Sequence, residues 1–270
     1  MRLVDSHCHL QADRFDADVD QVIGAARLAG VERILVPGWN PESCHAALEL
    51  VDRFPWLDAA VGVHPHDADK VDDAAWEEIA SLANDPRVVA TGETGLDFDR
   101  LFSPIHRQLA NLHRNLLLAA ETGKPAILHC RSAAGKRDAQ DLLLAEIRAF
   151  GSVPPPVVIH SFSGPIDYAE AMLDLGATIS ISGLAFRKGE EATAEVVRRA
   201  PGDRLLVETD SPYLSPPGAP RGRNAPEWVR ITAAWVADLR GDDRDAFGDQ
   251  LVATYDRVFG LTLEGRKGYS

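Results

Sequence analysis

The chain has 270 residues, of which 45% are hydrophobic and 26% are charged, a composition typical of a globular protein with a full core. Its 28 basic and 41 acidic residues give a net charge of −13, which argues against a protein that coats nucleic acid through a basic face. No apolar run approaches the roughly 18 residues of a membrane span. Polar residues interrupt the N-terminal segment where a signal peptide would be apolar, so we expect a cytoplasmic protein that does not enter a membrane.

Eight short apolar runs have the length and the β-branched composition of strands buried on both faces of a parallel sheet. These predicted strands cover residues 2–5, 33–36, 59–63, 88–91, 126–128, 157–159, 177–182 and 205–208. Between several of them, apolar residues recur at the helical period. The clearest predicted helices cover residues 18–29, 41–54, 74–83, 105–122 and 138–150, and a last helix over 244–258 precedes a frayed C-terminal end.

Strands and helices that alternate in this way predict a (β/α)8 TIM barrel, with an open, doubly wound sheet as the alternative. The alternation continues through Pro154-Pro155-Pro156, which we interpret as a stiff turn into the sixth strand rather than a linker between domains. Barrels of this kind reach about 250 residues as one unit, so a single domain over residues 1–270 is expected.

The segment Asp5-Ser6-His7-Cys8-His9 lies at the end of the first predicted strand. Alternate side chains of a strand point to the same face, so His7 and His9 leave the backbone together and are able to bind one metal ion. Two histidines near an N-terminus are also compatible with an incidental pair. By the same alternation Cys8 points away from the two rings, and we interpret it as a packing residue.

Polar residues that suit metal or phosphate binding follow most of the other predicted strands. They are His64 and His66 after the third, Glu93 at the fourth, His129 and Arg131 after the fifth, His160 after the sixth and Asp210 after the eighth. In a parallel barrel all strands end at one face, where the active sites of this fold are built. The sequence therefore predicts a metal site at the C-terminal face of the strands.

Six segments carry these residues: Asp5-Ser6-His7-Cys8-His9-Leu10, Gly62-Val63-His64-Pro65-His66, Gly92-Glu93-Thr94-Gly95-Leu96-Asp97, His129-Cys130-Arg131, His160-Ser161-Phe162-Ser163-Gly164 and Glu208-Thr209-Asp210-Ser211-Pro212-Tyr213-Leu214. In this order they closely resemble the motifs of the TatD family of metal-dependent deoxyribonucleases, within the amidohydrolase-like barrels. The resemblance continues to the loop Arg221-Gly222-Arg223-Asn224.

The resemblance implies a hydrolase with two divalent metal ions, with Mg²⁺, Mn²⁺ or Zn²⁺ as candidates. By matching position, one ion would be held by His7, His9, Glu93 and Asp210. The second would be held by His129 and His160, with Glu93 as the bridge. Mixed imidazole and carboxylate ligands suit Zn²⁺, Mn²⁺ or Fe²⁺ better than an all-oxygen Mg²⁺ cage, although the phosphate of a substrate can complete a Mg²⁺ shell.

Asp210 and Glu93 are the predicted catalytic residues. A carboxylate beside the ions can orient and deprotonate the attacking water, which makes Asp210 the best candidate for the general base. An N-cap of the turn at Ser211-Pro212 is the alternative role for Asp210. Two ions about 3.5 to 4 Å apart can activate this water and stabilise both the attacking and the leaving oxygen of a phosphodiester.

Five residues at the same face are predicted to contact the phosphates of a substrate: His64, His66, Arg131, Arg221 and Arg223. Guanidinium groups bind phosphate oxygens in pairs. The alternatives are a structural turn at Pro65 for the two histidines and solvated loop charges for the arginines. By the alternation of side chains along a strand, Cys130 points away from His129, as Cys8 does from His7 and His9. We therefore interpret Cys130 as a packing residue as well.

The function that these observations favour is hydrolysis of DNA phosphodiester bonds by a metal-activated water. Cleavage from 3′ to 5′, as an exonuclease on single-stranded or frayed ends, is implied by the family resemblance alone. A rival with the same fold would hydrolyse an ester or amide, such as the ester of a D-aminoacyl-tRNA, because the ions polarise whichever electrophile is bound. A metal-binding scaffold without activity is the third alternative. DNA is the expected partner, and a monomer is expected.

Overall fold

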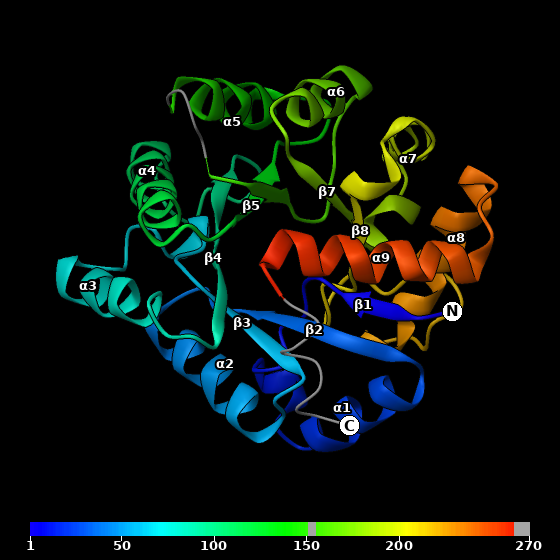
Figure 1. Cartoon of the computed structure of the whole chain (residues 1–270). Helices are drawn as coiled ribbons and strands as arrows, with labels where there is room; N and C mark the ends of the chain where they lie inside the picture. The colour runs from blue at the N-terminus through cyan, green and yellow to red at the C-terminus, as the bar shows by residue number, and fades with distance from the viewer. Residues whose placement is uncertain (151–154, 262–270) are drawn as a thin grey trace.

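The computed structural model describes residues 1–150 and 155–261 and arranges them as the (β/α)8 barrel that the sequence predicts (Figure 1). Its eight parallel strands are hydrogen-bonded to one another in chain order. They are β1 (Leu3–Asp5), β2 (Val31–Pro37), β3 (Leu57–Val61), β4 (Val88–Asp97), β5 (Ala126–Arg131), β6 (Val157–Ile159), β7 (Thr178–Ile181) and β8 (Leu205–Val207). All three residues of β6 are buried, as expected of a strand covered on both faces.

Helices surround the strands (Figure 1). The α-helices are α1 (Val19–Leu28), α2 (Pro41–Arg53), α3 (Asp73–Leu82), α4 (Ile105–Thr122), α5 (Asp138–Ala149), α6 (Ile166–Asp174), α7 (Ala192–Arg199), α8 (Val229–Arg240) and α9 (Arg244–Phe259). Short 3₁₀ helices cover Asp13–Phe15, Pro65–Asp67, Gly183–Phe186, Gly202–Arg204 and Pro226–Trp228. The six helices predicted above agree with these bounds to within about one residue at each end. The predicted frayed end, and Pro154 of the predicted turn, lie outside the described residues.

Strand β4 is longer than predicted, because it continues to Asp97 instead of ending before Gly92. Gly92 lies against β5 so closely that a Cβ at this position would come within 2.5 Å of Ile127 O. A glycine inside a strand often marks such a close approach of two backbones, and here it does not end the strand. The extension places Glu93 inside the barrel instead of on a loop.

The barrel closes where β1 meets β8. Ser6 N donates a hydrogen bond to Val207 O at 3.1 Å, and Asp210 N donates one to His7 O at 2.9 Å. A parallel bridge between Cys8 and Ser211 continues the contact past both strands. These backbone bonds bring the first and the last of the strand-end motifs side by side.

Helix α9, drawn in red in Figure 1, lies across the N-terminal end of the barrel. Tyr255 on α9 donates a hydrogen bond to Asp58 Oδ2 at 2.8 Å, and Arg33 Nε on β2 donates to the same oxygen at 2.9 Å. The side chains of Asp58 and Tyr255 are buried, and that of Arg33 is only 11% exposed. Helix α9 and this ion pair cover part of the N-terminal end, whereas the predicted functional residues lie at the opposite end, where barrels of this kind carry their active sites.

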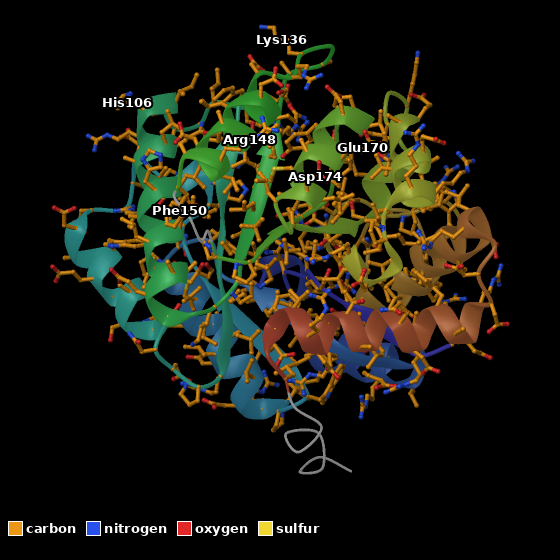
Figure 2. The ribbon with its side chains drawn as sticks, turned by 45° about the horizontal axis from the view of Figure 1, so that its top comes forward. His106, Lys136, Arg148, Phe150, Glu170 and Asp174 are labelled. Carbon is orange, nitrogen blue, oxygen red and sulfur yellow. The ribbon has the colours of Figure 1, made fainter. Side chains whose placement is uncertain are left out.

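The outer face of the helices is polar. Figure 2 shows Arg148 near the C-terminal end of α5, and Glu170 and Asp174 on α6, among the side chains on the outside of the molecule. The helix that follows each strand of such a barrel runs back toward the N-terminal end. The C-terminal end of α5, and with it Arg148, therefore lies far from the strand ends that carry the motifs. Among residues 1–150 and 155–261, no helix has the length and apolar character needed to cross a bilayer.

Candidate metal centre

The two histidines that follow β1 face each other at the C-terminal end of the barrel. His7 Nε2 lies 3.2 Å from His9 Nε2, and both residues are buried. The extended backbone after Asp5 directs both rings to one side and Cys8 to the other, where its Sγ lies 3.2 Å from Ser211 Oγ. The two imidazoles are therefore close enough to share one ion.

Glu93 on β4 lies among the histidines and directs its two oxygens to different sides. Oε2 lies 3.1 Å from His7 Nε2 and 3.7 Å from His9 Nε2. Oε1 lies near three other ring nitrogens, at 3.1 Å from His129 Nδ1, 3.3 Å from His64 Nε2 and 3.5 Å from His160 Nε2. One carboxylate thus faces two groups of nitrogen atoms, which is the arrangement that a ligand bridging two cations requires.

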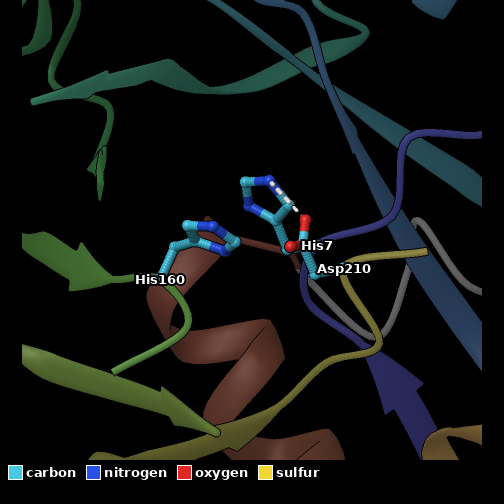
Figure 3. Close-up of side chains that lie close together, drawn as sticks. All are labelled: His7, His160 and Asp210. Carbon is cyan, nitrogen blue, oxygen red and sulfur yellow. Dashed lines mark ion pairs between the residues drawn. The ribbon is translucent and has the colours of Figure 1, made fainter. Parts of the chain in front are cut away.

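Asp210 joins the first group from the end of β8. Its Oδ1 lies 3.4 Å from His9 Nε2 and 4.0 Å from His7 Nε2. Its backbone has a φ of 51°, in the left-handed region that few residues other than glycine adopt, and the hydrogen bond to His7 O holds it there. Figure 3 shows the ion pair between His7 and Asp210 with His160 beside them. The rings of His7 and His160 stack with their centroids 3.6 Å apart.

Among the described residues there are three sets of potential metal ligands, and within each set the ligand atoms lie within 4.8 Å of one another. These sets are His7 with His9 and Glu93, His7 with His160 and Asp210, and His64 with Glu93 and His129. All six residues expected as ligands therefore lie in one connected group of side chains, which we call the metal cluster. His160 lies between the two sides of Glu93, since it stacks on His7 and also faces Glu93 Oε1.

Two buried carboxylates orient the rings of the second group. Glu208 Oε1 lies 2.8 Å from His160 Nδ1, and Asp97 Oδ2 lies 3.2 Å from His129 Nε2. A carboxylate at one ring nitrogen fixes the proton there and leaves the other nitrogen with a lone pair for a metal. In both rings that other nitrogen faces Glu93.

Glu208 and Asp97 were not among the predicted site residues, although a signal for both is present in the sequence. Glu208 stands two residues before Asp210, and Asp97 stands four residues after Glu93. Even spacing along an extended chain puts side chains on the same face, so this spacing could have indicated that each carboxylate lies beside a predicted ligand.

His64 differs from the other rings in its hydrogen bonding. Its Nδ1 accepts a hydrogen bond from His66 N at 3.0 Å, so the proton of a neutral His64 belongs on Nε2. Burial lowers the pKa of His64 to about 4, which keeps the ring neutral at pH 7. With Nε2 as a donor, His64 suits a hydrogen bond to an anion better than a bond to a metal.

The charged carboxylates and imidazoles of this site shift one another's pKa. Burial would raise the pKa of Glu93, but the charges of His64, His160 and His7 hold it well below its usual range. Burial also opposes protonation of His160, yet the carboxylates of Glu208 and Glu93 raise the pKa of this ring to about 10. The carboxylates are therefore ionised and draw positive charge to the centre.

The donor set fits divalent cations. The Nε2 atoms of His7 and His9 point at each other and at the Glu93 carboxylate, while their Nδ1 atoms are buried without a hydrogen-bond partner among the described residues. A neutral imidazole has one N–H and one lone pair. Two ring nitrogens and one carboxylate, all able to act as acceptors, therefore meet at this point with too few N–H groups to satisfy them. A cation satisfies all three, and mixed imidazole and carboxylate ligands are typical of Zn²⁺ and Mn²⁺.

Three of the residues expected to contact phosphate lie at the mouth of the barrel. The rings of His64 and His66 are 4.3 Å apart between centroids, and His66 Nε2 lies 2.8 Å from the Asp97 carboxylate. Arg131, at the end of β5, is exposed and pairs with Asp99 at 2.7 Å. These side chains are within reach of a molecule bound over the metal cluster.

The other two expected phosphate contacts lie on the loop that follows β8. Arg221 is exposed, whereas the guanidinium of Arg223 binds both oxygens of Asp18 at 2.7 Å and lies over the ring of Phe15. Arg223 is thus engaged within the fold and fastens the loop to the start of α1.

Cys8 and Cys130 are buried, as expected of packing residues. Burial raises the pKa of the Cys130 thiol to about 12, and it raises the pKa of Cys8 well above its usual range. Neither sulfur is a thiolate at neutral pH, so neither offers a nucleophile.

Comparison with known proteins points to the same chemistry. A family model described as TatD related DNase matches residues 4–260. The chain is 36% identical over 269 residues to a protein of Klebsiella pneumoniae (strain 342) named 3′-5′ ssDNA/RNA exonuclease TatD, covering 97% of this chain and 100% of that one. It is 32% identical to the Bacillus subtilis (strain 168) protein named uncharacterized metal-dependent hydrolase YabD, covering 98% and 97%. The solved structure of YJJV, a TatD homolog from Escherichia coli k12, superposes with a TM-score of 0.87 at 29% identity, covering 97% and 99%.

Proposed function

The chain belongs to the TatD-related DNase family, and we propose that it is a two-metal phosphodiesterase that removes nucleotides from the 3′ ends of single-stranded or frayed DNA. The observation that carries the proposal is the position of Glu93, whose two oxygens face two groups of ring nitrogens. The DNA substrate follows from the family, and the direction of cleavage follows from the names of its relatives.

We assign two sets of ligands around Glu93. The first ion would be held by His7, His9, Asp210 and Glu93 Oε2, and the second by His129, His160 and Glu93 Oε1. When bound, divalent ions of this kind lower the pKa of water and neutralise charge on a phosphate. Mg²⁺, Mn²⁺ and Zn²⁺ are the candidates, and the histidine-rich set favours the latter two.

Asp210 is the proposed general base. Its side chain is 13% exposed, more than those of Glu93 and His7, so a water molecule is able to reach it from the mouth. The water oxygen attacks phosphorus, the bond from phosphorus to the leaving oxygen breaks, and the proton of the water moves to Asp210. The leaving oxygen takes a proton from solvent. His64 Nε2 donates a hydrogen bond to a phosphate oxygen and so stabilises the charge that develops there.

An acidic chain has to hold DNA through a few local groups. Arg131 and Arg221 are exposed at the C-terminal face, and each guanidinium is able to bind two oxygens of a phosphate. Because this attraction is electrostatic, affinity for an oligonucleotide should fall as salt rises. The mouth of a barrel admits the end of one strand more readily than the side of a duplex.

A single-stranded oligonucleotide labelled at its 5′ end tests the proposal. In the presence of Mg²⁺, Mn²⁺ or Zn²⁺ we expect a ladder of products that shortens from the 3′ end, and slower cleavage of a fully paired duplex. Asp210→Asn should leave the oligonucleotide whole while the protein stays folded. A D-aminoacyl-tRNA is offered under the same conditions, and cleavage of its ester while the oligonucleotide remains whole would contradict the proposal.

A further inference from the structure

A cavity of about 580 Å³ lies beside the metal cluster, a size common for small-molecule sites. It is lined by the segment after β7, by the loop after β8 and by Arg14. Its lining includes two aromatic residues, Phe186 and Tyr213, and the arginines Arg187 and Arg221. We call it the arginine cavity, and no residue given a role in the chemistry above lines it except Arg221.

Tyr213 connects the arginine cavity to the metal cluster. Its backbone N–H donates to Asp210 O at 2.9 Å, and its ring centroid lies 6.1 Å from that of His9. The side chain is 52% exposed, although an aromatic ring of this size usually gains by being covered. An aromatic face is therefore left open next to the position of the reacting phosphate.

The charge of the arginine cavity is opposite to that of the whole chain. The protein has a net charge of −13 with 41 acidic residues, yet three arginines and no aspartate or glutamate line this cavity. The guanidinium groups of Arg187 and Arg221 form no hydrogen bond or ion pair within residues 1–150 and 155–261. Cations that the fold does not use, placed beside an exposed ring, suit a ligand that carries both a phosphate and an aromatic base.

The walls of the arginine cavity are fixed by hydrogen bonds. Arg14 donates to Pro212 O at 3.2 Å and to Gly222 O at 2.5 Å, which ties together both ends of the loop after β8. On the other side, Gly183 lies so close to Leu214 O that any Cβ would overlap it. The cavity is therefore formed before a ligand arrives, which reduces the entropy lost on binding.

We propose that the arginine cavity binds one of the two nucleotides that flank the bond to be cut, with its base stacked on Tyr213 and its phosphate facing Arg187 and Arg221. This inference rests on the proposed function and gives it a binding site for the strand. Stacking on an aromatic ring accepts every base, so the cavity would favour unpaired strands without selecting a sequence. A base inside a duplex is stacked on its neighbours and does not enter.

Substitution of Tyr213 tests the stacking. Tyr213→Ala should raise KM for a single-stranded oligonucleotide by about 10- to 100-fold with a smaller change in kcat, whereas Tyr213→Phe keeps the ring and should retain the KM of the wild type. Oligonucleotides with an abasic sugar at the 3′-terminal or the penultimate position locate the base. At one of these positions the difference between the wild type and Tyr213→Ala should vanish.

Substitution of the two arginines tests the phosphate contact. Arg187→Ala and Arg221→Ala should each weaken oligonucleotide binding and reduce the slope of affinity against salt by about 0.7 to 1. Arg148→Ala, on the far end of α5, is the matched control and should change neither quantity. The inference would be overturned if Tyr213→Ala kept the wild-type KM and the two arginine variants kept the wild-type salt slope. It would also be overturned if the effect of Tyr213→Ala persisted unchanged at both abasic positions. Failure of the wild type to cut any oligonucleotide would instead overturn the proposed function.

Discussion

His160 Nδ1 lies 2.8 Å from Glu208 Oε1, while Nε2 of the same ring faces Glu93 Oε1 at 3.5 Å. The ring of His160 thus lies between two buried carboxylates, with Glu208 at one nitrogen and Glu93 at the other. Glu208 also accepts a hydrogen bond from Ser161 N at 2.6 Å, so its own position is fixed by the backbone. The orientation of His160, a proposed metal ligand, is therefore set by a residue that is not itself among the proposed ligands.

Glu208→Gln should weaken binding of Zn²⁺ or Mn²⁺ by about 10- to 100-fold, because a neutral amide no longer fixes the proton on His160 Nδ1 or raises the basicity of Nε2. Calorimetric titration of the demetallated protein measures the affinity, and circular dichroism checks the fold.

Glu146→Gln provides the matched control for this measurement. Glu146 Oε2 lies 2.6 Å from His113 Nε2, so it forms the same kind of pair between two outer helices, with the ring half exposed. Its loss should leave metal affinity unchanged. Equal affinities of the wild type and Glu208→Gln would mean that Glu208 only packs against His160.

Glu93→Gln should reduce hydrolysis by more than the 10- to 100-fold that loss of an outer partner costs, because it removes the charge proposed to be shared by both ions. Cys8→Ser should keep most of the activity, since the side chain faces Ser211 and not the metal cluster. Steady-state rates and the metal content of the two variants test this difference. Similar losses in both, with folding intact, would show that the assignment of Glu93 as the bridge is wrong.

The alternation of strand residues was enough to predict that several of these side chains lie close together. His7 and His9 are two residues apart in an extended segment, so the sequence alone places both rings on one side. The partner of His160 was harder to predict, because Glu208 follows a different strand and the pairing depends on how β6, β7 and β8 are ordered around the barrel. Local periodicity carries no information about that order.

Arg223 illustrates a second limit of sequence reasoning. A loop arginine near a metal site suggests a phosphate contact, but its partner Asp18 is 205 residues away in the chain and is brought to it only by closure of the barrel. The length of β4 was underestimated for a related reason, since Gly92 resembles a turn residue until the backbone of β5 is seen against it.

Arg223→Ala and Asp18→Asn should raise KM for an oligonucleotide by similar factors, and the double variant should add no further loss, because both residues fasten the same loop. The guanidinium of Arg223 holds the pKa of Asp18 below its usual range, so the pair is intact at neutral pH and is lost only as the pH falls through that pKa. If Arg223 instead bound phosphate directly, Asp18→Asn would free the guanidinium and lower KM.

The three cysteines should not react with a thiol reagent in the folded protein at pH 8. All are buried, and burial raises the pKa of Cys44 and of Cys130 to about 12, so the thiolate fraction is on the order of 1 in 10⁴. Ellman's reagent should detect three thiols after unfolding and almost none before. Rapid modification of one cysteine in the native protein would show that its burial is incomplete.

Titration of the demetallated protein with Mn²⁺ or Zn²⁺, while cleavage of a 5′-labelled single strand is followed, tests the central claim most directly. We predict no cleavage without added ion, because the carboxylates and imidazoles around Glu93 cannot by themselves activate water. Activity should rise to its maximum as two ions bind per chain. Full cleavage by the metal-free protein, or a maximum reached at one ion per chain, would contradict the two-metal site.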